Sequence, residues 1–544
     1  MRKPTDVLNS LSDKSKNPMY KYERLYRNLY NPEFYLLAYK NIYANDGSMT
    51  PGVDGVTTDG MSLERIDKII ASLKDHSYRP NPARRTYIAK KNNPAKKRPL
   101  GIPSGDDKLV QEVVRMILES IYEPTFSNVS HGFRPGKSCH TALVKIQNTF
   151  TGAKWFVEGD IQACFDSFDH HVLIEILRRR IKDEAFIGLM WKFLKAGYME
   201  QWKYHKTYTG TPQGSGISPI LANIYLNELD KYMEEYKQKF SQPTRTVNPA
   251  HRNMASRIFH YKAKNDKVWN TLSAEEQKKR ARILRQMRAE QRNLPTHPLR
   301  ETSYKSLQYV RYADDFLIGV VGSREDAERL KQDLAVFLKE KLGLTLSAEK
   351  TKITNTAQCA RFLNYDIYVS RSQDIKRLKN GKRQRVYYGV VQLRMPHEKW
   401  AAKLLELGAI RISKDKSGKE RWKAMSRGKL MNRTDIEILS RYNSEVRGYY
   451  NYYSLAGNVS TLNHFSSLMK YSMLKTFGSK YRCQVRKIKE RYVKDGEFTV
   501  PYTTKAGPKE AIYYHDGFRK QDKPQLGQVD ILDIYKKYSK PNSL

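Results

Sequence analysis

Three aspartates stand at the ends of apolar stretches, and they are the residues of this chain best suited to do chemistry. Asp314 and Asp315 interrupt the aromatic and β-branched segment 309–321, a pattern that predicts two strands joined by a tight turn with carboxylates at its tip. A second apolar run, 155–161, closes on Asp160. Aspartate is also a common turn former, so an isolated Asp-Asp pair would indicate little. Two acidic strand ends in one chain favour a shared site.

Carboxylates held on rigid strands suit nucleotidyl transfer. That reaction uses two Mg²⁺ ions roughly 4 Å apart, one of which activates the attacking 3′ oxygen while both stabilise the transferring phosphate. Two strands that each deliver an aspartate to one point would meet this requirement. We therefore interpret Asp160, Asp314 and Asp315 as catalytic residues and expect two Mg²⁺ ions as the cofactor.

The charge of the chain indicates a polyanionic partner. Its 544 residues include 98 Lys and Arg against 57 Asp and Glu, which gives a formal net charge of +41. Much of the affinity for a polyanion would come from counterion release, so binding would weaken steeply with salt. The length of the chain predicts two or three domains.

Cysteine usage and hydropathy indicate where the protein works. The four cysteines lie far apart and form no Cys-x-x-Cys pair, which favours a reducing compartment and offers no zinc site. The first residues lack the apolar core of a signal peptide, and no stretch approaches the roughly 18 apolar residues of a membrane span. We expect a soluble, intracellular protein without a membrane partner.

The segments around the aspartates predict a sheet backed by helices. Residues 84–91 and 96–103 form two basic strands around a turn, which either cover a triphosphate or make a plain basic surface. Segment 235–302 is strongly charged and poor in apolar residues, and we expect a solvated helical insertion, with RNA contact as the sharper alternative. Apolar spacing predicts helices over 62–73, 107–122, 173–194, 220–232 and 324–341.

The last third of the chain has a mainly α-helical pattern. A basic link over 370–393 precedes a capping box that opens a helix at Thr434, and a second helix covers 462–477. From residue 495 onward the pattern indicates little beyond short strands. The second helix is followed by a basic stretch that we predict to bind RNA through its phosphates, with Arg482, Arg486 and Lys487 as its candidate residues.

Six short motifs occur in one order along the chain. They are Arg98-Pro-Leu-Gly-Ile-Pro, His131-Gly-Phe-Arg-Pro, Asp160 with Phe165-Asp-Ser-Phe-Asp-His, Thr211-Pro-Gln-Gly, Tyr312-Ala-Asp-Asp and Lys350-Thr. In this order they resemble the group II intron-encoded reverse transcriptases and maturases, of the mitochondrial-like lineage that accompanies subgroup IIA introns. The resemblance runs from about residue 20 to about residue 491, nearly the whole chain.

The resemblance implies an α+β fold of the right-hand polymerase type. Fingers and a palm with a small antiparallel sheet would occupy residues 1–375, including an amino-terminal extension over about 1–75 and the charged insertion over about 235–302. An α-helical thumb, the maturase domain X, would occupy 376–490.

The tail, 491–544, would be at most a truncated or remnant DNA-binding domain. Many relatives carry a paired-Cys, His-Asn-His endonuclease there. In this sequence no Cys follows Cys483, and His515 is the one later His. The endonuclease is therefore missing from this sequence. If this chain is the whole natural protein, we expect a replication-fork primer to serve mobility instead.

The resemblance also implies roles for single residues. Asp160 and Asp314 would hold both Mg²⁺ ions, with Asp315 beside them. Phe165 would be the steric gate, whose ring leaves no room for a 2′-hydroxyl and so selects deoxynucleotides. The other implied residues are the nucleotide-binding Lys90, Arg98, Gln213 and Lys350 and the primer-grip Phe362, Leu363, Asn364 and Tyr365.

Three departures from the family pattern lie near the implied site. Asn364 stands where relatives usually have Gly in the primer-grip turn; because Asn tolerates positive φ, we expect the turn to survive. Gln162-Ala163 replaces the commoner Lys-Gly, and Ser215-Gly216 replaces Gly-Gly. Both lie next to the nucleotide, so we expect them to affect processivity and fidelity more than activity.

The implied function is an RNA-directed DNA polymerase that also binds its group II intron RNA as a maturase, promotes its splicing and supports retrotransposition by target-primed reverse transcription. Its partners would be the intron RNA, an RNA template with a DNA primer, target DNA and deoxynucleoside triphosphates, and a homodimer is one candidate assembly. The expected location is the bacterial cytoplasm, with an organelle matrix as the alternative.

Two other functions stay open on the residues alone. One is an RNA-binding splicing factor on a disabled polymerase, which would require the loss of a carboxylate. The other is a domesticated reverse transcriptase with a repair or defence role, against which the intact domain X argues.

Overall fold

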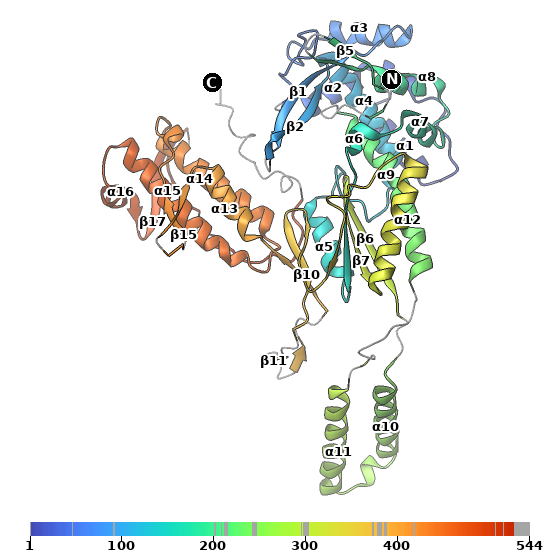
Figure 1. The fold of residues 1–544 in the computed structure, drawn as a ribbon, viewed down its shortest axis with the longest axis vertical. Helices are drawn as coiled ribbons and strands as arrows, with labels where there is room; N and C mark the ends of the chain where they lie inside the picture. The colour runs from blue at the N-terminus through green and yellow to red at the C-terminus, as the bar shows by residue number, and fades with distance from the viewer. Residues whose placement is uncertain are drawn as a thin grey trace.

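Three parts of the molecule are visible in Figure 1: a body that contains the central sheet, a mainly helical lobe to one side, and a pair of helices that extends away from the body. The computed structural model describes residues 2–45, 47–90, 93–200, 203–207, 209–210, 216–241, 247–294, 296, 304–372, 375–377, 383–385, 389–415, 417–418, 420–505, 507–514 and 516–526. For residues 90, 93–96, 375–377 and 383–385 it describes the backbone alone.

A four-stranded antiparallel sheet in the order β6-β7-β3-β8 lies at the centre of the body. The predicted hairpin is confirmed, because β6 and β7 flank a turn at Ala313 and Asp314. Successive side chains of a strand point to opposite faces, so Phe316 joins the core of the body while Leu317 joins a second core shared with the helical lobe. The strands are β3 (Trp155–Asp160), β6 (Ser306–Tyr312), β7 (Asp315–Val321) and β8 (Lys352–Asn355).

The body also contains a second four-stranded sheet in the order β2-β1-β4-β5, together with a set of helices. Within the central sheet, α12 packs on β3, and α5 and α9 pack on β6. The strands of the second sheet are β1 (Ala83–Lys90), β2 (Asn93–Ile102), β4 (Tyr198–Glu200) and β5 (Lys203–His205). The helices of the body are α1 (Pro4–Ser15), α2 (Pro32–Ile42), α3 (Leu63–Lys74), α4 (Gly105–Tyr122), α5 (Cys139–Thr149), α6 (Cys164–Ser167), α7 (His170–Arg178), α8 (Glu184–Lys195), α9 (Ser218–Phe240) and α12 (Arg324–Leu342), with short 3₁₀ turns at Tyr26–Tyr30 and Glu123–Thr125.

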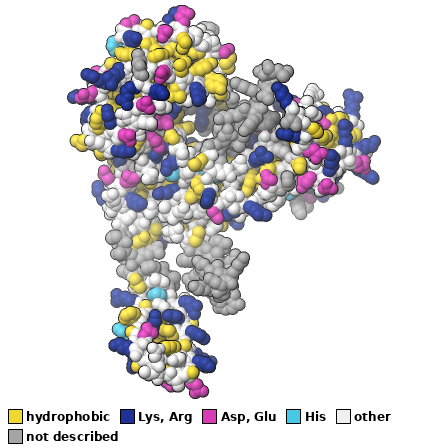
Figure 2. Space-filling view, turned by 180° about the vertical axis from the view of Figure 1, so that it is seen from behind, with side chains coloured by type: hydrophobic (Ala, Val, Ile, Leu, Met, Phe, Trp, Pro, Cys, Tyr) yellow, Lys and Arg dark blue, Asp and Glu magenta, His cyan; other side chains and the backbone are white. Residues whose placement is uncertain are grey.

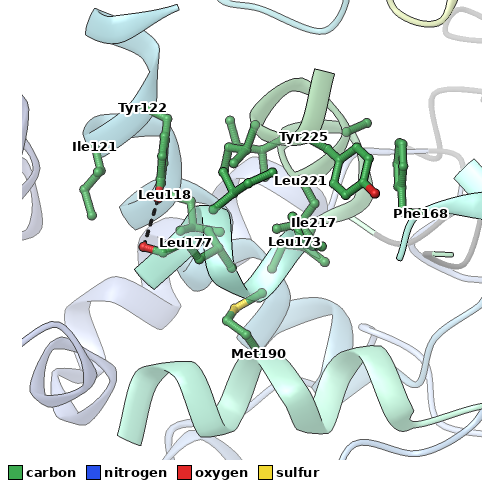
Figure 3. Close-up of a cluster of buried hydrophobic side chains, with 14 of the residues drawn as sticks. Leu118, Ile121, Tyr122, Phe168, Leu173, Leu177, Met190, Ile217, Leu221 and Tyr225 are labelled. Carbon is green, nitrogen blue, oxygen red and sulfur yellow. Dashed lines mark hydrogen bonds between the residues drawn. The ribbon is translucent and has the colours of Figure 1, made fainter. Parts of the chain in front are cut away.

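A buried apolar cluster joins several helices of the body, as Figure 3 shows. The Tyr122 hydroxyl donates a hydrogen bond to the Leu177 carbonyl at 3.4 Å, the dashed line of the figure, so the one polar group that Tyr122 brings into this cluster is satisfied. The labelled side chains come from α4, α7, α8 and α9 and the residues just before α7 and α9: Leu118, Ile121, Tyr122, Phe168, Leu173, Leu177, Met190, Ile217, Leu221 and Tyr225.

The single helix predicted over 173–194 is wrong, because the structure has two helices, α7 and α8, in this range. The connecting backbone pairs with a distant segment: Lys182 N donates to the Tyr22 carbonyl at 2.8 Å. Asp183 then caps α8, accepting from Phe186 N at 3.0 Å. An N-cap aspartate starts a new helix, and the apolar spacing on either side conceals the break.

The charged insertion forms the helical pair that extends from the body in Figure 1: α10 (Pro249–Asp266) and α11 (Ala274–Asn293), joined through a 3₁₀ turn at Trp269–Thr271. Asn265 is the one buried residue on the two helices. The predicted solvated helical excursion is therefore confirmed.

The helical lobe begins at a three-stranded sheet in the order β13-β10-β9 and ends in a hairpin, β17 and β18, that packs on α14. Thr434 and Glu437 make the predicted capping box of α14. The elements are β9 (Ala360–Phe362), β10 (Tyr365–Val369), β11 (Ile375–Arg377), β12 (Arg383–Arg385), β13 (Val391–Arg394), α13 (His397–Glu406), β14 (Ile410–Lys414), β15 (Glu420–Ala424), α14 (Asp435–Tyr453), α15 (Leu462–Lys480), α16 (Val485–Tyr492), β16 (Val493–Lys494), β17 (Glu497–Thr504) and β18 (Gly507–Ile512).

The surface carries the basic excess seen in the sequence. In Figure 2, Lys and Arg side chains are spread over this whole face of the molecule, including the extended helical pair. No helix among the described residues combines the length and the apolar character needed to cross a membrane.

Candidate active site

The structure brings the three predicted aspartates together at one end of the central sheet. Asp160, the last residue of β3, is the direct cross-strand partner of Asp315, the first residue of β7. Directly opposed residues of an antiparallel pair point to the same face, so the Asp160 and Asp315 side chains lie on one face of the sheet. Asp314 lies beside them in the turn.

Desolvation and neighbouring negative charges raise the pKa values of two of these aspartates. Desolvation, the charge of Asp314 and the hydrogen bond to Asp160 raise the pKa of Asp315 to about 8. Desolvation also raises the pKa of Asp314, and the charge of Asp160 adds to this effect, whereas Lys350 and Arg98 oppose it. Carboxylates that crowd each other in this way favour a proton or a cation between them.

Among the described residues, Lys350 is the one cation that pairs directly with Asp160. Its Nζ donates to Asp160 Oδ2 at 2.7 Å, and this hydrogen bond raises the pKa of Lys350. The Lys350 side chain remains 65% exposed, so a bound ligand could draw it away from Asp160.

The donor set fits a divalent metal. Hard cations such as Mg²⁺ prefer carboxylate oxygens, and the raised pKa values of Asp314 and Asp315 mark a cluster with more negative charge than its hydrogen-bond donors balance. Among the described residues, no three His, Cys, Asp or Glu side chains are already gathered into a metal-binding group. The fit therefore depends on the chemistry of these carboxylates and on the displacement of Lys350.

Phe165, the implied steric gate, follows Asp160 by five residues and lies on the short helix α6. Ala163, its N-cap, adopts a left-handed backbone with φ 46°. The Phe165 ring contacts Phe133 edge-on at 6.4 Å and Phe168 at 6.1 Å between ring centroids. Phe168 in turn packs on Tyr225 in the cluster of Figure 3. The ring is therefore backed by the core of the body.

The other implied nucleotide-binding residues are placed in part. Arg98 is exposed on β2 and close enough to Asp314 to lower its pKa. Lys90 ends β1, but its side chain lies outside the described residues, as does Gln213 entirely. Gly210, just before Gln213, has φ +82°, and a Cβ there would lie 2.6 Å from Asp166 Cα. The chain at this point can therefore carry no side chain.

The implied primer-grip residues form a two-residue hairpin turn between β9 and β10. Phe362 and Tyr365 pair with each other, while Leu363 and Asn364 have φ values of 49° and 58°. Two successive positive φ values are typical of a type I′ turn. The expectation that Asn364 would preserve this turn is confirmed.

The turn is held from the helical lobe by residues that the sequence did not single out. The Tyr452 hydroxyl donates to the Leu363 carbonyl at 2.9 Å, and the Tyr453 hydroxyl donates to the Asn364 carbonyl at 3.3 Å. Both tyrosines come from the end of α14. The Tyr449-Tyr450-Tyr452-Tyr453 cluster was visible in the sequence, but its target 89 positions away was not.

The predicted RNA-binding residues lie at the far end of the lobe. Arg482, Arg486 and Lys487 are exposed at and after the turn that precedes α16. Arg486 pairs with Glu490 at 3.0 Å. Their accessibility suits contact with phosphates.

Sequence reasoning also gave no role to Arg311, the residue that comes three before Asp314. It is completely buried and paired with the equally buried Asp230 of α9, Nη2 to Oδ2 at 2.6 Å. A charged residue within an apolar strand was the one signal for it.

Comparison with known proteins gives two family matches and several long relatives. Residues 88–248 and 281–367 match the reverse transcriptase (RNA-dependent DNA polymerase) family, and residues 389–520 match the type II intron maturase family. The chain is 46% identical to the group II intron-encoded protein LtrA of Lactococcus lactis subsp. cremoris, over 96% of this chain and 86% of LtrA.

Two yeast proteins are also similar over most of this chain. An uncharacterized 91 kDa protein in a cob intron of Schizosaccharomyces pombe is 37% identical over 99% of this chain and 62% of its own length. A putative COX1/OXI3 intron 2 protein of Saccharomyces cerevisiae is 33% identical over 94% of this chain and 58% of its own length.

Proposed function

Because this chain belongs to the group II intron-encoded proteins, we propose that Asp160, Asp314 and Asp315 form the metal-binding centre of its polymerase. The chain is an RNA-directed DNA polymerase of the α+β, right-hand type that also carries a type II intron maturase domain. The observation that carries the proposal is the cross-strand pairing of Asp160 with Asp315, on two adjoining strand ends, next to Asp314 in the turn.

Reverse transcriptase domains use divalent metal ions, and here we propose two Mg²⁺ ions. When bound, such ions act as Lewis acids toward the attacking oxygen and the transferring phosphate. The rigid register of β3 and β7 would hold the carboxylate oxygens that receive them. Lys350 would leave Asp160 and bind the triphosphate, because phosphate oxygens are strong partners for an ammonium group.

The remaining residues of the site would position the nucleotide and the primer. Lys90 and Arg98 would hold the triphosphate and neutralise its charge, and Gln213 would line the incoming nucleotide. Phe165, backed by Phe133 and Phe168, would exclude a 2′-hydroxyl by contact. The turn at Leu363 and Asn364 would support the primer end, and the thumb tyrosines would keep that turn in place.

We propose that the thumb and the amino-terminal helices hold the intron RNA by shape and by phosphate contact, with Arg482, Arg486 and Lys487 among the contacts. The RNA itself would perform the splicing chemistry. A splicing factor on a disabled polymerase would require a lost carboxylate, and all three are present.

The domain division remains a proposal as well: fingers and palm over 1–375, thumb over 376–490 and a remnant of a DNA-binding domain over 491–544. The hairpin β17–β18, which belongs to this last segment, packs on α14, so this segment would act together with the thumb.

Three finer proposals concern partners and place. The polymerase would start on target DNA for intron mobility, the protein would act in the cytoplasm, and a homodimer would be its assembly. The mass of the purified protein in solution, with and without RNA, tests the last of these.

Purified protein should extend a DNA primer on an RNA template with deoxynucleotides, and it should do so with Mg²⁺ but not with EDTA. A parallel assay should measure splicing of the intron that flanks its gene. Extension in EDTA, or no extension under any divalent cation, would contradict the metal centre.

A further inference from the structure

A single buried guanidinium connects the aspartate turn to two distant parts of the palm. The side chain of Arg311 is completely buried, as is that of its partner Asp230 on α9. Arg311 Nε donates to Asp230 Oδ1 at 2.8 Å, and Nη2 donates to Oδ2 at 2.6 Å. This is the two-point geometry in which Arg and a carboxylate bind each other most strongly.

The remaining donors of Arg311 reach other elements. Nη1 donates to the Ala313 carbonyl at 2.8 Å and to Asn223 Oδ1 at 3.3 Å, and Nη2 donates to Ser130 Oγ at 2.8 Å. An arginine side chain has five N–H groups, and these contacts use all of them. Lysine has three donors on one atom, so it could not make the same set of contacts.

The hydrogen bond from Arg311 to the Ala313 carbonyl stabilises an unfavourable backbone conformation. Ala313 is the first residue of the acidic turn and has φ 56°, a conformation that costs an alanine energy. The next residue is Asp314. Because the peptide group is planar, a fixed Ala313 carbonyl fixes the peptide from which the Asp314 side chain departs.

The same network reaches the nucleotide side of the site through the loop 130–133. The backbone pairs on both sides of Arg311, with His131 N donating to the Arg311 carbonyl at 2.9 Å and Arg311 N donating to the Val129 carbonyl at 2.8 Å. Asn223 Nδ2 donates to the Gly132 carbonyl at 2.9 Å. A Cβ at Gly132 would lie 2.4 Å from Ala313 N, so this loop touches the turn, and its Phe133 ring contacts Phe165.

We propose that Arg311 is a positioning residue of the polymerase reaction: its guanidinium fixes the turn that carries Asp314 and couples that turn, through Ser130 and the loop 130–133, to the ring of Phe165. Arg311 touches no reacting atom. This inference rests on the proposed role of the aspartates. It adds that the metal-binding side and the sugar-selecting side of the site are held by one network.

The first test is Arg311→Lys in the full chain, assayed by primer extension. We expect kcat to fall about 100-fold, because a displacement of about 1 Å at a reacting group has this effect, while KM for the deoxynucleotide changes less than about threefold. The Mg²⁺ concentration for half-maximal rate should rise, and discrimination against ribonucleotides should weaken. Binding to the intron RNA should stay within about twofold, because the maturase surface is elsewhere.

The matched control is Arg427→Lys in the thumb. Arg427 makes a similar two-point pair with Glu445, at 2.6 and 3.0 Å, and its side chain is 9% exposed. This variant should lower the melting temperature and leave kcat, the Mg²⁺ dependence and sugar discrimination unchanged. If Arg311→Lys behaves like it, with a lower melting temperature alone, Arg311 is structural and the proposal is wrong.

Loss of RNA binding by Arg311→Lys would show that this variant fails to fold. In that case Ser130→Ala tests the proposal instead. This change removes one hydrogen bond from the guanidinium, so kcat should fall about tenfold and the Mg²⁺ requirement should rise. Unchanged values in Ser130→Ala would overturn the coupling. A wild-type protein that extends no primer would contradict the proposed function instead.

Discussion

The palm and the thumb each contain a crowded carboxylate, and the two are balanced in opposite ways. In the thumb, burial alone would raise the pKa of Asp435, but hydrogen bonds from Lys480, Tyr492 and Tyr481 lower it below its ordinary value. In the palm, desolvation and the like charge of Asp314 raise the pKa of Asp315 to about 8. Asp435 has its donors within the protein, whereas desolvation and like charges outweigh the attraction of Lys350 at Asp315.

This difference separates a structural carboxylate from one prepared for a ligand. Lys480 Nζ lies 2.6 Å from Asp435 Oδ1, and the Tyr481 hydroxyl lies 2.8 Å from Oδ2, so ionisation of Asp435 stabilises the fold. Desolvation and the like charges around them oppose ionisation of Asp314 and Asp315 until a cation binds. The ionised palm aspartates therefore destabilise the folded protein when no ligand is bound, and a bound cation would relieve this repulsion.

The largest expected effect comes from removing one palm carboxylate. Asp314→Asn should lower primer extension by about a thousandfold or more, because metal coordination contributes several kcal/mol to the transition state. Splicing assistance should remain nearly intact, because the substitution removes repulsion without disturbing the thumb. Single-turnover extension and intron splicing, measured on one preparation, check this. Comparable loss of both activities would mean that the palm and the thumb do not act separately.

The next largest effect should be on the discrimination between deoxyribonucleotides and ribonucleotides. Phe165→Ala should admit ribonucleotides, with discrimination falling about 100-fold, because the ring that would contact a 2′-hydroxyl is gone. Extension rates with matched deoxy- and ribonucleotides measure it. Phe168→Leu is the control, because it alters the packing behind Phe165 while leaving the gate ring in place. Unchanged discrimination in Phe165→Ala would remove the gate assignment.

Removing the thumb carboxylate should lower stability rather than activity. Asp435→Asn should lower the free energy of unfolding by about 1–3 kcal/mol, because it leaves buried donors poorly matched, and it should leave kcat of primer extension unchanged. Because the folded pKa of Asp435 is below the unfolded value, its stabilisation is present above an unfolded pKa of about 4 and is lost as pH falls through the folded value. Denaturant melts of wild type and variant at neutral and acidic pH should therefore converge at acidic pH.

The sequence predicted the local parts of this comparison well. The acidic hairpin, the strand that ends in Asp160 and the capping box at Thr434 all depend on neighbours within a few residues, and the structure confirms them. Asn364 was expected to accept a positive φ, and it does.

What the sequence could not supply is pairing over long separations. Arg311 and Asp230 are 81 residues apart, and Lys350 and Asp160 are 190 residues apart. From the sequence alone, Arg311 and Lys350 cannot be told apart from surface residues, because their partners are close only in the folded structure. The break between α7 and α8 escaped for the same reason, since its backbone pairs with Tyr22.

The smallest expected effect distinguishes two neighbouring cations of the thumb. Arg486 has Glu490 as a partner at 3.0 Å, whereas Lys487 forms no ion pair with any described residue. Lys487→Gln should therefore weaken binding to structured RNA several-fold at low salt and reduce the slope of log affinity against log salt by about one. Arg486→Gln should weaken RNA binding less. In the wild type, Arg486 must leave Glu490 before it can contact a phosphate, so its contribution to RNA affinity is already smaller. Equal effects of the two substitutions, or binding that ignores salt, would mean that this end of the thumb does not hold RNA by its phosphates.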